Sequence, residues 1–159
     1  MKKVLQVLRD ALALEHQGHE YYRNAYEESL DPVVRSVLSA LAQDEEAHES
    51  IITEYYRALE AGQGWPHADE EFTAIRPAEE RIRDLFYGSG MDIHIPATFF
   101  QVYDHAYNLE VRSRDFYREQ LADAADIQAQ KFFRFLVQLE DIHIAMLDYF
   151  LKSAGSNAE

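Results

Sequence analysis

Two short motifs combine a carboxylate with an imidazole at a spacing that suits metal binding. They read EEAH at residues 45–48 and EDIH at residues 140–143. Residues three apart are neighbours on one helix face, so the first glutamate and the histidine of each motif can bind the same ion. A further glutamate precedes each motif by 30 residues, at Glu15 and Glu110. The sequence therefore predicts a metal centre with six ligands, which are Glu15, Glu45, His48, Glu110, Glu140 and His143.

The charge and chemistry of these ligands indicate which metal the centre would hold. Ionised carboxylates buried in a helical bundle are costly unless they are paired, protonated or bound to metal. Only one base, Arg114, lies near them in the sequence pattern, so we expect two divalent cations to balance four glutamates. Oxidation of both ions would leave a positive site that can accept anionic oxygen species, which favours a redox metal. Carboxylates with one imidazole per ion suit iron or manganese better than zinc or calcium.

Four long segments with helical periodicity must position these ligands. In each, apolar and aromatic residues recur at steps of three and four, and the candidate ligands interrupt this pattern at its middle. We expect an all-α fold: an antiparallel four-helix bundle with hairpins over residues 3–60 and 97–152. The intervening residues 61–96 contain most of the glycines and prolines and predict a long crossover, with one short helix near residues 78–87. Residues 1–159 are interpreted as a single domain.

The two hairpins resemble each other in sequence. A shift of 95 positions, without gaps, places Glu15 on Glu110 and also aligns the two motifs. Pairing of two such hairpins about a pseudo-twofold axis would bring the ligands together inside the bundle. For Trp65 and the 82–86 segment, docking on the bundle and burial against a second subunit both stay open.

Composition excludes several other classes of protein. The formal net charge of −14 argues against nucleic acid as a partner. The absence of cysteine excludes disulfides, zinc ribbons, iron–sulfur clusters and thiol nucleophiles. No apolar run is long enough for a membrane-spanning helix, and the first residues do not resemble a secretory signal, so we expect a cytoplasmic protein without a membrane partner.

With these ligands and hairpins, the chain resembles the ferritin-like di-iron carboxylate proteins, and within them the rubrerythrin-like group. The resemblance implies two iron ions, with manganese or zinc as possible substitutes. It implies that Glu45 and Glu140 bridge the ions, that Glu15 and Glu110 bind one ion each, and that His48 and His143 do likewise. It also implies an oxidoreductase whose ferrous pair reacts with hydrogen peroxide or dioxygen and protects against oxidative stress.

The chain departs from this group in ways that shape the expectations. A cysteine-ligated rubredoxin module is absent, so electrons must come from a separate donor protein. Peroxidase-type members carry an extra glutamate where this chain has Ser113, and the mirrored position is Gly18. These two small residues could leave room for an oxidant. The tail after Leu151 is too short for the fifth helix of ferritin cages, and we expect a homodimer instead.

Several residues near the ligands have two possible roles. Tyr22 and Tyr117 could hydrogen-bond a carboxylate of a neighbouring helix, or simply fill the core. Glu46 and Asp141 could accept a hydrogen bond from a ligand imidazole, although a solvated position is favoured. His19 and Arg114 are interpreted as edge contacts to the acidic centre. Surface positions are expected for the remaining histidines, which are His16, His67, His94 and His105.

Two other functions stay open on sequence alone. The first is an iron-binding or sequestering protein that oxidises iron without true turnover. The second is a structural bundle in which other metals, or protons shared among the glutamates, stabilise the core.

Overall fold

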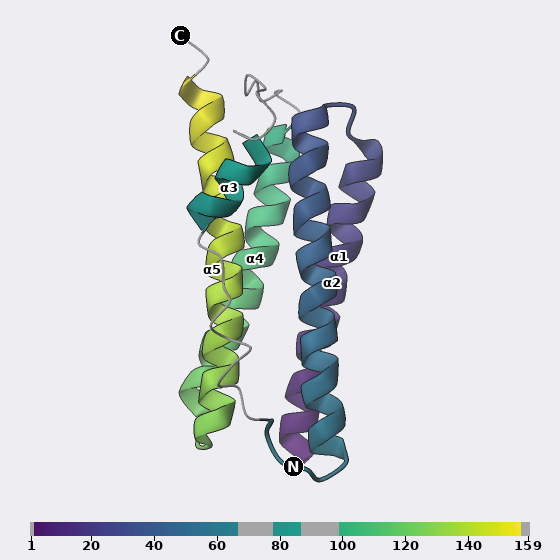
Figure 1. The fold of residues 1–159 in the computed structure, drawn as a ribbon, viewed down its shortest axis with the longest axis vertical. Helices are drawn as coiled ribbons and strands as arrows, with labels where there is room; N and C mark the ends of the chain where they lie inside the picture. Colours follow the sequence, from purple (N-terminus) through teal and green to yellow (C-terminus); the bar gives the residue numbers. More distant parts are fainter. Residues whose placement is uncertain (1, 67–77, 87–98, 157–159) are drawn as a thin grey trace.

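The computed structural model describes residues 2–66, 78–86 and 99–156, and most of them are helical. Within these ranges the helices are α1 (Lys2–Glu28), α2 (Pro32–Glu60), α3 (Ala78–Phe86), α4 (Phe99–Asp123) and α5 (Ile127–Ser156). The pair α1 and α2 forms one antiparallel hairpin and the pair α4 and α5 forms the other, with α1 packed against α4 (Figure 1). The all-α fold and the antiparallel four-helix bundle predicted from the sequence are confirmed.

The turns of the two hairpins are built in the same way. Asp31 caps the start of α2 by accepting hydrogen bonds from two backbone N–H groups, and Pro32 takes the first helical position. Asp126, its counterpart after a shift of 95 positions, accepts from the backbone N–H groups of Gln128 and Ala129 at the start of α5. The capping aspartates therefore fix both hairpin turns by the same local chemistry.

The bundle core consists of two apolar clusters at opposite ends of the helices. One cluster is centred on Leu38, Leu41 and Phe150, and the other on Leu8, Ile52 and Phe132. Between them the buried residues are polar, as the interrupted helical pattern predicted. The apolar clusters thus enclose one polar layer.

The described parts of the crossover lie on the bundle. Helix α3 contacts α5 and α2, and its Ile82 is buried in the first apolar cluster. Trp65 packs against Tyr55 and Phe132 at the other end. These contacts show the docking alternative for both segments, while residues 67–77 and 87–98 of the predicted crossover lie outside the described residues.

Two helix ends differ slightly from the predicted ones. The short helix ends at Phe86, and α5 continues to Ser156, beyond the predicted end of the second hairpin at residue 152. None of the described helices is long and apolar enough to cross a membrane. The interpretation of the whole chain as one domain stays a prediction.

Candidate metal centre

The polar layer brings the six predicted ligands together. All six side chains come from the middle of the four long helices, and none is more than 4% exposed. They form two groups of four, and within each group the potential ligand atoms lie within 4.8 Å of one another. One group is Glu15, Glu45, His48 and Glu140, and the other is Glu45, Glu110, Glu140 and His143. Glu45 and Glu140 therefore belong to both groups, which is the arrangement that two adjacent ions with shared carboxylates require.

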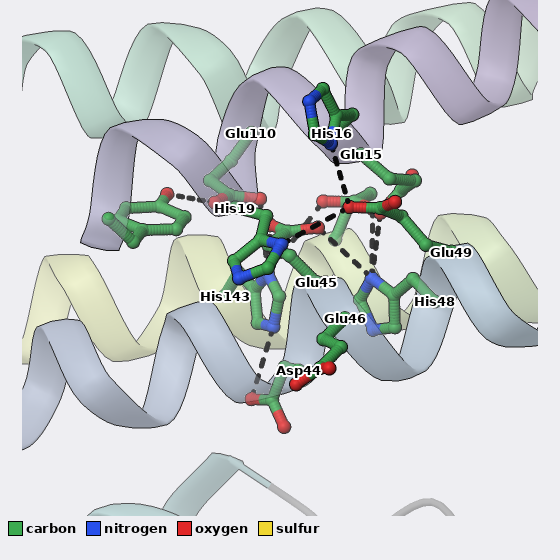
Figure 2. A network of polar contacts seen from close by, with 12 residues as sticks. Glu15, His16, His19, Asp44, Glu45, Glu46, His48, Glu49, Glu110 and His143 are labelled. Atoms are coloured by element: carbon green, nitrogen blue, oxygen red, sulfur yellow. Dashed lines mark hydrogen bonds and ion pairs between the residues drawn. The ribbon is translucent and has the colours of Figure 1, made fainter. Parts of the chain in front are cut away.

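The remaining ligands follow the pseudo-twofold symmetry of the hairpins. His48 on α2 points its Nδ1 atom at Glu15 Oε2 on α1, at 2.9 Å. His143 on α5 points its Nδ1 atom at Glu110 Oε2 on α4, at 3.2 Å. Figure 2 shows these side chains converging between the helices. Each hairpin thus contributes one glutamate and one imidazole that face the shared carboxylates.

Two buried tyrosines tie the hairpins together. Tyr22 on α1 donates a hydrogen bond to Glu110 on α4, and Tyr117 on α4 donates to Glu15 on α1. Of the two roles that the sequence left open, the structure shows the hydrogen bond to a carboxylate. Burial and the neighbouring carboxylates raise the pKa of both tyrosines well above 10, so each keeps its proton and stays a donor.

The two shared glutamates differ in their partners. Glu45 lies 3.3 Å from His48 Nδ1 and 3.4 Å from His143 Nδ1. Among the described residues, neither carboxyl oxygen of Glu140 has a hydrogen-bond partner, although both are buried. Burial, followed by repulsion from Glu15 and Glu110, raises the pKa of Glu140 well above its ordinary value. Burial and the same two carboxylates raise the pKa of Glu45 to about 8. Buried polar atoms without partners are rare in native proteins, and here they fit oxygen ligands that a cation would share.

The other four ligands are held in their charged forms. Burial raises the pKa of Glu15 and Glu110, but the adjacent imidazoles outweigh it, and the net result is a lowered pKa, to about 2 for Glu110. Burial opposes the charged imidazoles, yet the neighbouring carboxylates raise the pKa of His48 to about 9 and that of His143 well above 6.5. Two carboxylates are therefore neutralised by two imidazolium groups.

This proton distribution corrects the expectation that Arg114 is the only base near the four glutamates. The sequence pattern offered only Arg114 as a counter-charge, and Arg114 pairs instead with Asp115. Without metal, two imidazolium groups and two protonated glutamates leave the layer neutral. Two divalent cations fit the same site by replacing the four protons, because ligand glutamates and histidines must lose their protons to bind metal.

Asp44 is a neighbour of the centre that the sequence analysis missed. Its carboxylate accepts from His143 Nε2 at 3.3 Å and also pairs with Arg81 of α3. A carboxylate behind a ligand imidazole fixes the orientation of the ring. The two residues considered for this role, Glu46 and Asp141, are exposed, and Asp141 pairs with Arg118.

We expect Asp44→Asn to weaken binding of the ion at His143 by about 10–100-fold, because the imidazole loses its charged partner. Spectroscopic titration of the metal-free protein with cobalt(II) measures the affinity. Asp141→Asn is the matched control, since Asp141 is an acidic neighbour of a ligand but contacts no imidazole, and should leave binding unchanged. Equal affinities for the two variants would show that Asp44 does not position His143.

The structure also places the two small residues, Gly18 and Ser113. A Cβ atom on Gly18 would lie only 3.2 Å from Cδ and Oε1 of Glu45. A shared carboxylate therefore lies in the space beside Gly18, and room for an oxidant near the two small residues stays a prediction. Ser113 is buried beside the same layer, with 8% of its surface exposed.

The structure also places the other histidines. His19 contacts Glu49 rather than the buried carboxylates, and His16 contacts the same residue. His105 is exposed and lies against Tyr21, whereas His67 and His94 are outside the described residues. No helical-spacing signal could reveal the partner of His16, because Glu49 belongs to the other helix of the hairpin.

Comparison with known proteins agrees with the fold. The family model described as Rubrerythrin matches residues 6–151, which include all six candidate ligands. Neither the curated proteins nor the solved structures yield a match to the chain.

Proposed function

Because the chain belongs to the rubrerythrin family of ferritin-like di-iron domains, we propose that it is a di-iron oxidoreductase that reacts with hydrogen peroxide or dioxygen. The observation that carries the proposal is that both groups of ligands share Glu45 and Glu140. Two ions held by common carboxylates can act on one substrate molecule together. When bound, two ferrous ions supply the two electrons that, with two protons, reduce one hydrogen peroxide to two water molecules.

The residues around the centre support this chemistry in defined ways. Glu45 and Glu140 would each contact both ions, while Glu15 with His48 and Glu110 with His143 would complete one ion each. Tyr22 and Tyr117 orient the two terminal glutamates and hold protons beside the centre. The two apolar clusters exclude bulk water from both ends of the layer. The carboxylate and imidazole ligands favour iron, with manganese or zinc as substitutes.

The partners follow from the composition of the chain. Without cysteine the chain has no rubredoxin module, so we propose that a separate protein delivers the electrons. The net charge of −14 disfavours nucleic acid. A cytoplasmic location, a homodimeric state and a role in protection from oxidative stress stay predictions from the sequence.

Anaerobic reconstitution with ferrous iron, followed by rapid mixing with hydrogen peroxide or dioxygen, tests the proposal. We expect both irons to be oxidised rapidly, as measured by stopped-flow absorbance and Mössbauer spectroscopy, and to be reduced again by a suitable donor. A pair that stays ferrous on mixing with either oxidant contradicts the proposal. Slow oxidation with release of iron and no re-reduction would instead indicate sequestration without turnover.

A further inference from the structure

A third cluster of potential metal ligands lies outside the buried layer. His16 and His19 on α1 point their Nδ1 atoms at the same oxygen of Glu49 on α2, at 3.5 and 3.3 Å. The potential ligand atoms of these three residues, here called the outer triad, lie within 4.8 Å of one another. Figure 2 shows both imidazoles converging on the Glu49 carboxylate.

The contacts within the outer triad are not ordinary hydrogen bonds. Glu49 Oε1 is a buried oxygen without a hydrogen-bond partner among the described residues, although two imidazole nitrogens approach it. The three groups thus surround a common position without satisfying one another. A cation at that position would satisfy the oxygen and both nitrogens at once.

The outer triad is accessible to solvent, unlike the buried centre. The side chain of His16 is 64% exposed, and those of His19 and Glu49 are 25% and 27% exposed. The three residues line an open groove of about 1190 Å³ along α1 and α2. Glu46 and Glu54 on the groove wall favour cations, with Arg57 as the opposing charge.

The outer triad is not a by-product of the duplicated centre. A shift of 95 positions relates the six buried ligands in pairs, but it places Val111, Arg114 and Ile144 at the positions of His16, His19 and Glu49. None of these three can act as a carboxylate or imidazole ligand. The cluster therefore belongs to the first hairpin alone and needs its own explanation.

We propose that His16, His19 and Glu49 bind one divalent transition-metal ion at the surface, separate from the buried pair. Two imidazoles and one carboxylate are a ligand set that suits ferrous iron, cobalt and zinc, and three protein ligands leave positions for water. Two of the ligands are chain neighbours of the buried ligands Glu15 and His48. The outer triad is thus a surface capture site on the helix pair that carries half of the buried centre. This inference does not depend on the redox chemistry proposed above.

Counting zinc ions bound per chain tests the inference. Tag-free protein is titrated by isothermal calorimetry, with equilibrium dialysis and elemental analysis as a second count. We expect the double variant H16Q/H19Q to bind one ion fewer than the unchanged protein, and E49Q to lose the same ion. H105Q removes a histidine outside the outer triad and should keep the full count, while circular dichroism checks that every variant is folded.

The difference between variants separates this inference from the proposed function. If both are right, the unchanged protein binds three ions and H16Q/H19Q binds two. If the buried pair fails to bind, the counts are one and zero, and the outer triad is still supported. Equal counts for the unchanged protein and H16Q/H19Q overturn the inference. The exposed single variant H16Q, which should weaken the same ion, decides the matter if the double variant does not fold.

Discussion

Glu140→Gln should abolish binding of both buried metal ions without destabilising the metal-free protein. Glu140 is shared by both ligand groups, so its loss removes a ligand from each ion. In the metal-free fold its pKa is raised well above the ordinary value, and glutamine closely resembles the protonated carboxyl group. Loss of a residue that only orients a ligand lowers metal affinity by ~10–100-fold. We expect Glu140→Gln to lower the affinity for the ion pair by more than this, because Glu140 is itself a ligand. The free energy of unfolding of the metal-free protein should match that of the unchanged protein below about pH 4.5, and should exceed it by a growing margin as the pH rises above 4.5, because glutamine needs no proton to be buried.

Glu110→Gln is the matched control, because it changes the same chemical group in the opposite electrostatic state. Glu110 has a pKa lowered to about 2 and holds the His143 imidazolium and the Tyr22 hydroxyl. Its loss leaves a buried charge without its partner, which typically costs about 3–5 kcal/mol. We therefore expect Glu110→Gln to destabilise the metal-free protein and to impair chiefly one ion. Urea unfolding and metal counts on both variants test these expectations. Equal destabilisation by the two variants would contradict the assigned proton positions.

The stability of the metal-free protein should decrease as the pH rises from about 5 to 9. Glu45, with its pKa raised to about 8, and His48, raised to about 9, bind protons more tightly in the folded state. The pKa values of Glu140 and His143 are also raised. Each group contributes stability that is complete below its unfolded pKa and is lost as the pH passes its folded pKa. At about 1.4 kcal/mol per pKa unit, these shifts together change the free energy of unfolding by several kcal/mol over this pH range.

Calorimetry between pH 5 and 9 measures this effect. We expect Tm of the metal-free protein to fall by roughly 10 °C or more, since 1 kcal/mol shifts Tm by about 2–4 °C at this size. The lowered pKa values of Glu15 and Glu110 also make the stability depend on pH. Their contribution is lost only as the pH falls below about 4.5, outside this range. A Tm that is flat or rises over this range would contradict the raised values.

Metal binding should show the reverse pH dependence. Two divalent ions replace about four protons, so each ion displaces about two, and its affinity should rise about 100-fold per pH unit below pH 8. Calorimetric titration with zinc in buffers of different ionisation enthalpy measures the protons released. H16Q/H19Q should release the same number of protons from the buried layer, because its substitutions lie outside that layer.

The sequence predicted those parts of the site that repeat along single helices. The ligands occupy the middle of apolar patterns at steps of three and four, and their duplication in the second hairpin confirmed the register. The same spacing placed Tyr22 and Tyr117 two turns from Glu15 and Glu110 along the same helix faces, but it left core packing and a hydrogen bond to a neighbouring helix both open. Such spacing signals depend only on helix geometry, which the sequence determines locally.

The features that the sequence did not reveal depend on contacts between helices. Asp44 lies in α2 and meets His143 of α5, and its counterpart in the repeat is Leu139, so no duplication marked it. Glu49 of α2 contacts His16 of α1, and this contact between helices also has no signal in the spacing along either helix. The proton positions on Glu45 and Glu140 follow from burial and mutual repulsion, which only the assembled layer defines.

The positions of the bound metals test the central claim most directly. Crystals of the iron-loaded protein, measured at the iron absorption edge, should give two anomalous peaks inside the polar layer, about 3.5–4 Å apart as in other two-metal sites. Both peaks should contact Glu45 and Glu140, with Glu15 and His48 on one ion and Glu110 and His143 on the other. A single peak in the layer, or iron bound only outside it, would contradict a paired centre built by these six side chains.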